Sequence, residues 1–176
     1  MLAPFLAISR GHMFDIALLE LSARVGLALQ ARGRMLACAE SCTGGLVAGL
    51  VTAVAGSSGW FDRGFVTYSN AAKTAQLGVS EATLAAHGAV SEQTAAEMAA
   101  GALRAAGAQA GVSTTGIAGP GGATPGKPVG TVCFGWAWLD EAGAVQTRTA
   151  THIFDGDRTA VRMAAVRAAL QGLLEP

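Results

Sequence analysis

The stretch from Met35 to Val54 constrains the fold most, because it predicts a buried strand that turns directly into a buried helix. Residues 35–39 form a short apolar run, and residues 46–54 form a longer one that suits a helix buried on most sides. Between them lies the sequence Ala-Glu-Ser-Cys-Thr-Gly-Gly at 39–45. The first N–H groups of a helix lack intrahelical partners and carry the positive end of its dipole, so this junction suits an anion or an oxyanion.

Ser41 presents a hydroxyl at this junction. Taken alone, the simplest interpretation is that Ser41 or Thr43 caps the following helix, since both residue types are common N-caps. The rest of the chain favours a catalytic interpretation.

The composition predicts a folded domain with no affinity for nucleic acid or membranes. A length of 176 residues suits one domain, and 51% hydrophobic with 14% charged residues predicts a substantial core. A net charge of +0 argues against binding to nucleic acid or anionic membranes. No apolar run is long enough for a membrane span. We expect residues 1–13 to be an extension or a cloning remnant, and 14–176 to form the single domain.

The cysteines and histidines do not suggest a disulfide framework or a metal site. The three cysteines are an odd number without C-x-x-C spacing, and each lies in an apolar run, which is typical of reduced, buried thiols. We therefore expect a cytoplasmic protein. The three histidines stand far apart, so no metal site is expected.

The element order predicts an α/β fold, a three-layer sandwich of a mixed sheet with helices on both faces. Asn70, Ser80 and Ser91 are expected to cap helices, as is Asp155 or Asp157. The predicted helices are 14–31, 44–54, a short one carrying Lys73, 80–87, 92–106 and 158–174, and the predicted strands are 35–39, 63–69, 110–115, 129–139 and 144–153, the last two as an antiparallel hairpin.

Residues 121–127 imitate a phosphate-binding P-loop. That motif requires Ser or Thr next and then a helix, whereas Pro128 and a strand pattern follow here. We therefore exclude nucleoside triphosphate hydrolysis and interpret the segment as a loop.

Lys73 is the best candidate for a base that activates Ser41. A serine hydroxyl is a weak nucleophile until a base takes its proton, and no histidine lies near the end of a motif. A lysine can act as that base when burial lowers its pKa. Ser41 and Lys73 both follow strand ends, and such junctions share one crevice in open α/β sheets. The alternative for Lys73 is an exposed helix charge.

Two further segments are candidates for ligand binding. Thr115 and Gly116 lie where a strand runs into a glycine-rich turn, and Arg158 begins the last helix, where it could pair with a carboxylate or phosphate. Taken alone, each is as well explained by an ordinary loop or a surface arginine.

Together these segments resemble the CinA C-terminal domain family. The resemblance runs from about residue 14 to near the C-terminus, with the motifs in family order. They are 39–45 (AESCTGG), 56–58 (GSS), 64–70 (GFVTYSN), Lys73, 88–92 (GAVSE), 116–120 (GIAGP), 127–132 (KPVGTV) and 156–158 (GDR).

The resemblance implies a nicotinamide-nucleotide amidase of the stand-alone form, without the N-terminal domain of larger CinA proteins. Such an enzyme hydrolyses the carboxamide of nicotinamide mononucleotide to nicotinate mononucleotide and ammonia, in pyridine nucleotide salvage, without metal or cofactor. It also implies a homo-oligomer, with a dimer favoured. A non-catalytic domain that binds a pyridine nucleotide or a protein, and an amidase for another carboxamide, remain alternatives.

By the same resemblance, Ser41 is the nucleophile, Lys73 the general base and Tyr68 a residue that assists the proton relay. The oxyanion donors are expected either at the start of the helix after Gly44 or around Thr115 and Gly116. The candidate substrate-binding residues are Glu40, Thr43, Gly44, Gly45, Asn70, Thr115, Gly116 and Arg158.

Overall fold

One five-stranded mixed sheet, in the order β2-β1-β3-β4-β5, forms the centre of the computed structural model, which describes residues 13–175. The prediction for residues 1–13 therefore falls almost entirely outside the described residues. The strands are β1 (Leu36–Glu40), β2 (Phe61–Val66), β3 (Ala110–Gly116), β4 (Thr131–Leu139) and β5 (Val145–Ile153). The helices are α1 (Ile16–Ala31), α2 (Leu46–Thr52), α3 (Asn70–Leu77), α4 (Glu81–His87), α5 (Glu92–Ala106) and α6 (Arg158–Gly172), with a 3₁₀ turn at Ser57–Gly59.

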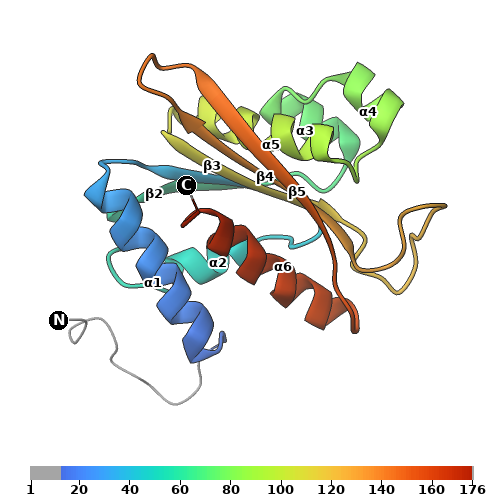
Figure 1. The fold of residues 1–176 in the computed structure, drawn as a ribbon, viewed down its shortest axis with the longest axis horizontal. Coiled ribbons are helices and arrows are strands. Elements are labelled where there is room, and N and C mark those ends of the chain that lie inside the picture. Colours follow the sequence, from blue (N-terminus) through green and yellow to red (C-terminus); the bar gives the residue numbers. More distant parts are fainter. Residues whose placement is uncertain (1–12, 176) are drawn as a thin grey trace.

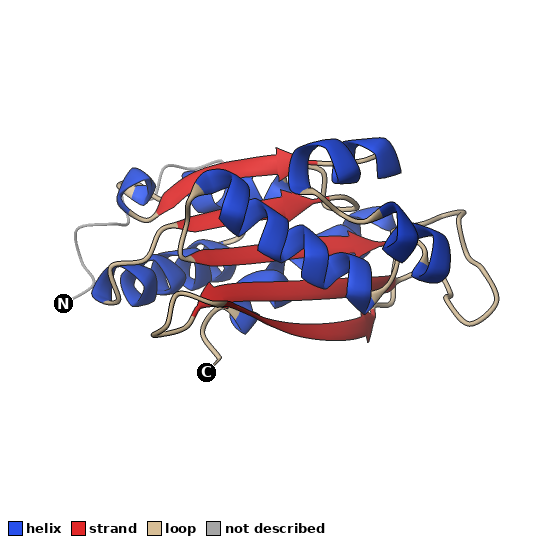
Figure 2. Cartoon of the chain, turned by 90° about the horizontal axis from the view of Figure 1, so that it is seen from above, coloured by secondary structure: helices blue, strands red, loops and turns tan. Residues whose placement is uncertain are grey.

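The helices form two layers, as the element order predicts. Helices α1, α2 and α6 cover one face of the sheet, and α3, α4 and α5 lie on the other (Figure 1). Seen from above, the strands lie side by side between helices on both faces (Figure 2). The three-layer α/β architecture is thus confirmed.

Strand alternation distributes the side chains of β1 between the two layers. Leu36 and Cys38 pack into the core under α1, α2 and α6, whereas Ala37 and Ala39 pack into the core under α3 and α5. Successive side chains of a strand point to opposite faces, so Glu40 faces α2 and Ser41 faces α3. This alternation places the nucleophile candidate in the layer that holds Lys73.

The carboxyl ends of three parallel strands meet at one edge of the sheet. β1 pairs in parallel with both β2 and β3, and β4 and β5 continue the sheet as an antiparallel hairpin. The segments after β1, β2 and β3 therefore share one crevice, where ligands commonly bind in α/β sheets.

The prediction for the second strand was wrong in its boundaries. A strand was expected over 63–69, but β2 ends at Val66. The chain leaves the sheet because Ser69 is the N-cap of α3 and accepts a hydrogen bond from the Ala72 N–H group at 3.1 Å. The expected cap Asn70 is instead the first helical residue.

Other caps agree with the sequence. Ser80, Ser91 and Asp157 each accept a hydrogen bond from the first turn of the helix that follows. The segment after residue 127 leads into β4, so no helix follows the imitation P-loop. Among residues 13–175, no helix combines the length and apolar character needed to cross a membrane.

Candidate active site

The turn between β1 and α2 is held by the carboxylate of Glu40. This side chain is 1% exposed and accepts hydrogen bonds from the N–H groups of Gly45 (2.9 Å), Val47 (3.0 Å) and Ala48 (2.9 Å). The hydroxyl of Thr43 donates a fourth bond at 2.7 Å. Glu40 therefore satisfies the N–H groups that begin α2, a task usually left to an N-cap side chain.

The alternative that Ser41 or Thr43 caps α2 does not hold. Gly45 occupies the N-cap position with φ of 97°, and no side chain there makes a cap hydrogen bond. Gly44, with φ of 58°, is also left-handed, a conformation that glycine adopts without strain. The two glycines let the chain turn sharply enough for Glu40 to reach the helix start, which leaves the Ser41 hydroxyl available.

Lys73 lies beside Ser41. Its Nζ donates hydrogen bonds to the Ser41 Oγ at 3.2 Å and to the Thr67 carbonyl at 2.9 Å. Lys73 and Leu77 are the buried residues of α3, one helical turn apart on the face that meets the core. The side chain of Lys73 is 1% exposed, so the alternative of a surface charge does not hold.

Burial changes the acid–base behaviour of Lys73. Desolvation disfavours the ammonium form and lowers the pKa of Lys73 below its ordinary value, against a weaker opposing influence of Cys42. A neutral amine has a lone pair that can accept the Ser41 proton. The Thr67 carbonyl accepts from the amine and holds it beside Ser41.

Cys42 lies next to Ser41 but is not a competing nucleophile. Burial raises the pKa of the Cys42 thiol to about 12, so the thiol stays protonated near neutral pH. Only the thiolate is strongly nucleophilic. All three cysteines are free and buried, as the sequence predicted.

A cavity of about 230 Å³ opens in front of Ser41 and Lys73. Four of the predicted substrate-binding residues line it, whereas Glu40, Thr43, Gly44 and Gly45 lie outside its lining, in the turn behind Ser41. The lining consists of Ser41, Cys42, Tyr68, Asn70, Lys73, Ala89, Val90, Thr115, Gly116, Ala118 and Arg158.

Tyr68 and Arg158 meet at the rim of this cavity. The guanidinium of Arg158 donates to the Tyr68 hydroxyl at 2.9 Å and to the Gly119 carbonyl at 2.8 Å. Tyr68 is 62% exposed, which is high for a large side chain and leaves its ring accessible to a ligand. The two residues come from opposite layers, so the N-terminus of α6 and the segment after β2 together close one side of the cavity.

Thr115 and Gly116 line the cavity, but the hydroxyl of Thr115 and the missing side chain of Gly116 also have structural roles. The Thr115 hydroxyl donates to the Ala89 carbonyl at 2.7 Å and so ties β3 to the segment before α5. A side chain at position 116 would place its Cβ 2.6 Å from the Thr131 carbonyl oxygen. Glycine is needed there for the approach of β3 to β4, independently of any ligand.

Arg162 also belongs to the site, although the sequence analysis did not select it. Its guanidinium donates to the Cys42 carbonyl at 3.1 Å and to the Thr43 carbonyl at 2.8 Å. Arg162 lies four residues after Arg158 and therefore on the same face of α6. That spacing was visible in the sequence, but nothing showed that this face meets the Ser41 turn.

Comparison with known proteins identifies a family and close relatives. Residues 18–176 match the CinA C-terminal domain family. The nicotinamide-nucleotide amidohydrolase PncC of Enterobacter agglomerans is 57% identical over 92% of this chain and 96% of its own length. The protein of the same name from Escherichia coli K12 is 55% identical over 92% of this chain and 95% of its own length.

Solved structures give the same result. The crystal structure of the competence/damage-inducible protein CihA from Agrobacterium tumefaciens superposes with a TM-score of 0.85 at 46% identity, covering 93% of this chain and 98% of that one. With the family match spanning most of the sequence, the chain belongs to the CinA C-terminal domain family.

Proposed function

We propose that this protein hydrolyses the carboxamide of nicotinamide mononucleotide to nicotinate mononucleotide and ammonia, with Ser41 as nucleophile and Lys73 as general base. The observation that carries the proposal is the 3.2 Å contact between Lys73 Nζ and Ser41 Oγ at the wall of a cavity, made by a lysine whose pKa is lowered by burial. The names of the relatives, at 55–57% identity over nearly their whole length, supply the substrate class.

The reaction begins with attack of Ser41 Oγ on the carboxamide carbon. The Ser41 proton passes to the neutral amine of Lys73, and an oxyanion forms on the former carbonyl oxygen. As the C–N bond breaks, the Lys73 ammonium returns the proton to the leaving nitrogen, which departs as ammonia. Water then attacks the ester on Ser41, and Lys73 takes its proton and returns one to Ser41 Oγ as the carboxylate is released.

The oxyanion requires preorganised hydrogen-bond donors. The N–H groups of Gly45, Val47 and Ala48 are bound to Glu40, so they are not available for this task. We place the donors in the backbone nearer the cavity, at Cys42 or at Gly116, which both line it.

The cavity fits the reactive part of the nucleotide better than the whole. Its volume of about 230 Å³ is smaller than the roughly 300–1,000 Å³ typical of pockets for drug-sized ligands. We propose that the carboxamide-bearing ring enters the cavity and that the phosphate stays at the rim, where Arg158 can pair with it.

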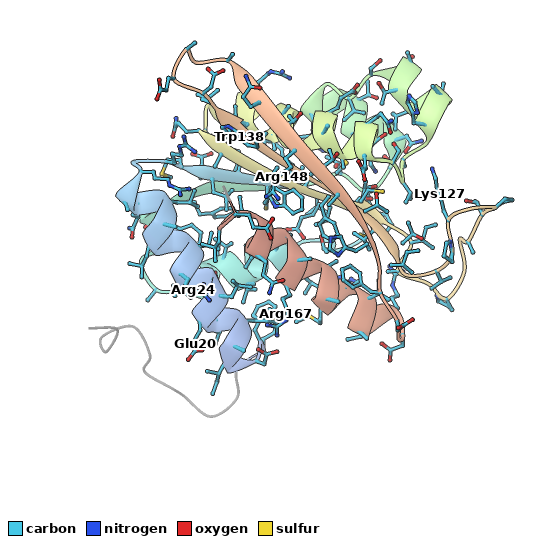
Figure 3. The ribbon with its side chains drawn as sticks, viewed as in Figure 1. Glu20, Arg24, Lys127, Trp138, Arg148 and Arg167 are labelled. Atoms are coloured by element: carbon cyan, nitrogen blue, oxygen red, sulfur yellow. The ribbon has the colours of Figure 1, made fainter. Side chains whose placement is uncertain are left out.

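Ammonia release from nicotinamide mononucleotide tests the function. Wild type is expected to release ammonia, while Ser41→Ala and Lys73→Met lose about three orders of magnitude or more in kcat, as nucleophile and base act as a unit. Lys127→Met is the matched control, because Lys127 does not line the cavity and its Nζ donates to the His87 carbonyl instead (Figure 3). A wild type that binds the nucleotide without releasing ammonia would favour the binding-domain alternative, and turnover of other carboxamides alone would favour a different amidase.

A further inference from the structure

Arg162 holds the turn that carries Ser41 without lining the cavity. From α6, its Nε donates to the Cys42 carbonyl at 3.1 Å and its Nη2 donates to the Thr43 carbonyl at 2.8 Å. It is absent from the residues that line the cavity. Any influence of Arg162 on the reaction must therefore pass through the turn.

Three successive carbonyl groups of the turn are bound. The Ser41 carbonyl accepts from the Gly44 N–H at 3.1 Å, and Arg162 binds the next two carbonyls. A peptide bond is planar and trans, so fixing a carbonyl also fixes the direction of the N–H group in the same peptide. Within residues 13–175, no other group donates to the Cys42 carbonyl. Arg162 thus sets the plane of the peptide that joins Cys42 to Thr43.

Glu40 and Arg162 bind opposite ends of the peptide dipoles. Glu40 accepts from the N–H groups of Gly45, Val47 and Ala48, whereas Arg162 donates to carbonyl groups earlier in the same turn. The N–H groups of Cys42 and Thr43 are left without an oxygen partner among the described residues. Both face the Cys42 sulfur instead, and a pair of successive N–H groups favours negative charge beside it.

The charge around Cys42 agrees with this arrangement. Although burial raises the pKa of the Cys42 thiol, Arg162 and the N–H groups of Cys42 and Thr43 each act to lower it. The guanidinium and the two N–H groups therefore partly offset the cost of negative charge at the Cys42 sulfur, although the effect of burial is larger. An oxyanion formed on attack by Ser41 would be stabilised by the N–H groups of the turn that Arg162 holds in place.

We propose that Arg162 is a positioning residue, which holds the peptides after Ser41 in the orientation that stabilises the oxyanion. The inference rests on the proposed amidase function and adds a residue to it. Without the two-pronged guanidinium, the peptide between Cys42 and Thr43 can rotate and turn its carbonyl toward the developing negative charge.

Steady-state kinetics of Arg162→Gln and Arg162→Lys with nicotinamide mononucleotide test the proposal. We expect kcat to fall by about 10²–10³-fold for Arg162→Gln, the effect of losing an oxyanion donor, with KM changed by less than about threefold. Arg162→Lys keeps the charge but cannot bind both carbonyls with one planar group, so kcat stays low. The matched control is Arg167→Gln on the same helix, where Arg167 faces Asp15 near α1 (Figure 3).

Other outcomes would overturn the proposal. A kcat near wild type in Arg162→Gln, or a rise in KM at unchanged kcat, would show that the turn does not depend on Arg162 or that Arg162 binds substrate. Full activity in Arg162→Lys would show that charge alone suffices. An equal loss in Arg167→Gln would mean that any change on α6 harms the enzyme.

The rate at which a fluorophosphonate labels Ser41 distinguishes a failure of the positioning proposal from a failure of the proposed substrate. If wild type is labelled at Ser41 but does not release ammonia, the substrate assignment fails, while slow labelling of Arg162→Gln beside normal labelling of Arg167→Gln still supports the positioning role. If wild type is neither labelled nor active, Ser41 is not an activated nucleophile and both proposals fail.

Discussion

At the scale of single residues, the candidate site contains two buried ionisable side chains, Lys73 and Glu40, which lie on opposite faces of the sheet. Lys73 occupies a position in α3 where an apolar side chain would otherwise pack, and Glu40 ends a strand whose other residues are apolar. Each is 1% exposed. Lys73 is placed to act on Ser41, and Glu40 orders the turn that presents Ser41.

Burial of Lys73 predicts a pH-dependent effect on stability. The folded-state pKa of Lys73 lies below the ordinary value of 10.5, so between these two pKa values the unfolded chain binds more protons. The destabilisation is fully present below the folded-state pKa and disappears as the pH rises through 10.5. Lys73→Met removes this destabilisation, so the stability advantage of the variant over wild type should shrink as the pH rises from neutral toward 10.5, by at most about 1.4 kcal/mol per pH unit.

Urea unfolding of both proteins across this pH range measures the difference. Lys127→Met serves as the control and should differ from wild type by an amount that does not change with pH. A difference between Lys73→Met and wild type that is equally constant would mean that Lys73 keeps its ordinary pKa in the folded protein.

At the scale of elements, the segment between β2 and α3 matters most, because it carries Tyr68 and sets the direction of α3. Ser69 caps α3, and its neighbour Asn70 lines the cavity. The two adjacent residues therefore have different tasks, one in stability and one in the site.

Two alanine variants separate these tasks. Ser69→Ala should cost about 0.5–2 kcal/mol of unfolding free energy, because the Ala72 N–H group loses its acceptor. Asn70→Ala should leave stability within about 0.5 kcal/mol of wild type. Thermal unfolding measures both, and for a chain of this size about 1 kcal/mol shifts Tm by roughly 2–4 °C. A larger loss in Asn70→Ala than in Ser69→Ala would restore Asn70 as the cap.

Much of the element order could be predicted from the sequence. The caps Ser80 and Ser91 and the β4–β5 hairpin follow from local signals, and all agree with the structure. The choice between Ser69 and Asn70 could not be made, since both residue types are good caps and they are adjacent. Local rules taken alone would also give α2 a hydroxyl cap, whereas the long side chain of Glu40 reaches across the turn to the first N–H groups.

From the sequence, the site residues that follow strand ends were predicted better than those that depend on how a helix face packs. Ser41, Lys73 and Tyr68 follow strands, so a shared crevice could be expected, and the structure brings all three to one cavity. Arg162 could not be expected, because the face of α6 that meets the turn depends on how the two layers pack. The assignment of chemical roles to these residues stays a prediction.

At the scale of the whole molecule, the position of Lys73 depends on how closely α3 packs against α5. At Gly101 of α5, an added Cβ would lie 2.1 Å from the carbonyl oxygen of Leu77, the last residue of α3. The contact involves backbone, so no side chain can move aside to relieve it. Glycine at this point lets the helix that carries Lys73 lie against the core.

Gly101→Ala should therefore destabilise the protein although alanine favours helices. Helix propensity alone would add about 0.8–1 kcal/mol of stability, but overpacking typically costs about 1–3 kcal/mol. We expect a lower Tm and reduced ammonia release, because α3 must shift and carry Lys73 with it. Gly121→Ala is the control, since nothing lies within 4 Å of an added Cβ there. Equal Tm values for the two variants would show that the α3–α5 contact is not tight.

The central claim is that Ser41 attacks the carboxamide and becomes acylated, and mass spectrometry after rapid acid quench tests it most directly. With nicotinamide mononucleotide as substrate, the account predicts that the peptide containing Ser41 gains the mass of the nicotinate mononucleotide acyl group, and that Ser41→Ala neither gains it nor releases ammonia. Ammonia release by Ser41→Ala at the wild-type rate would contradict the account.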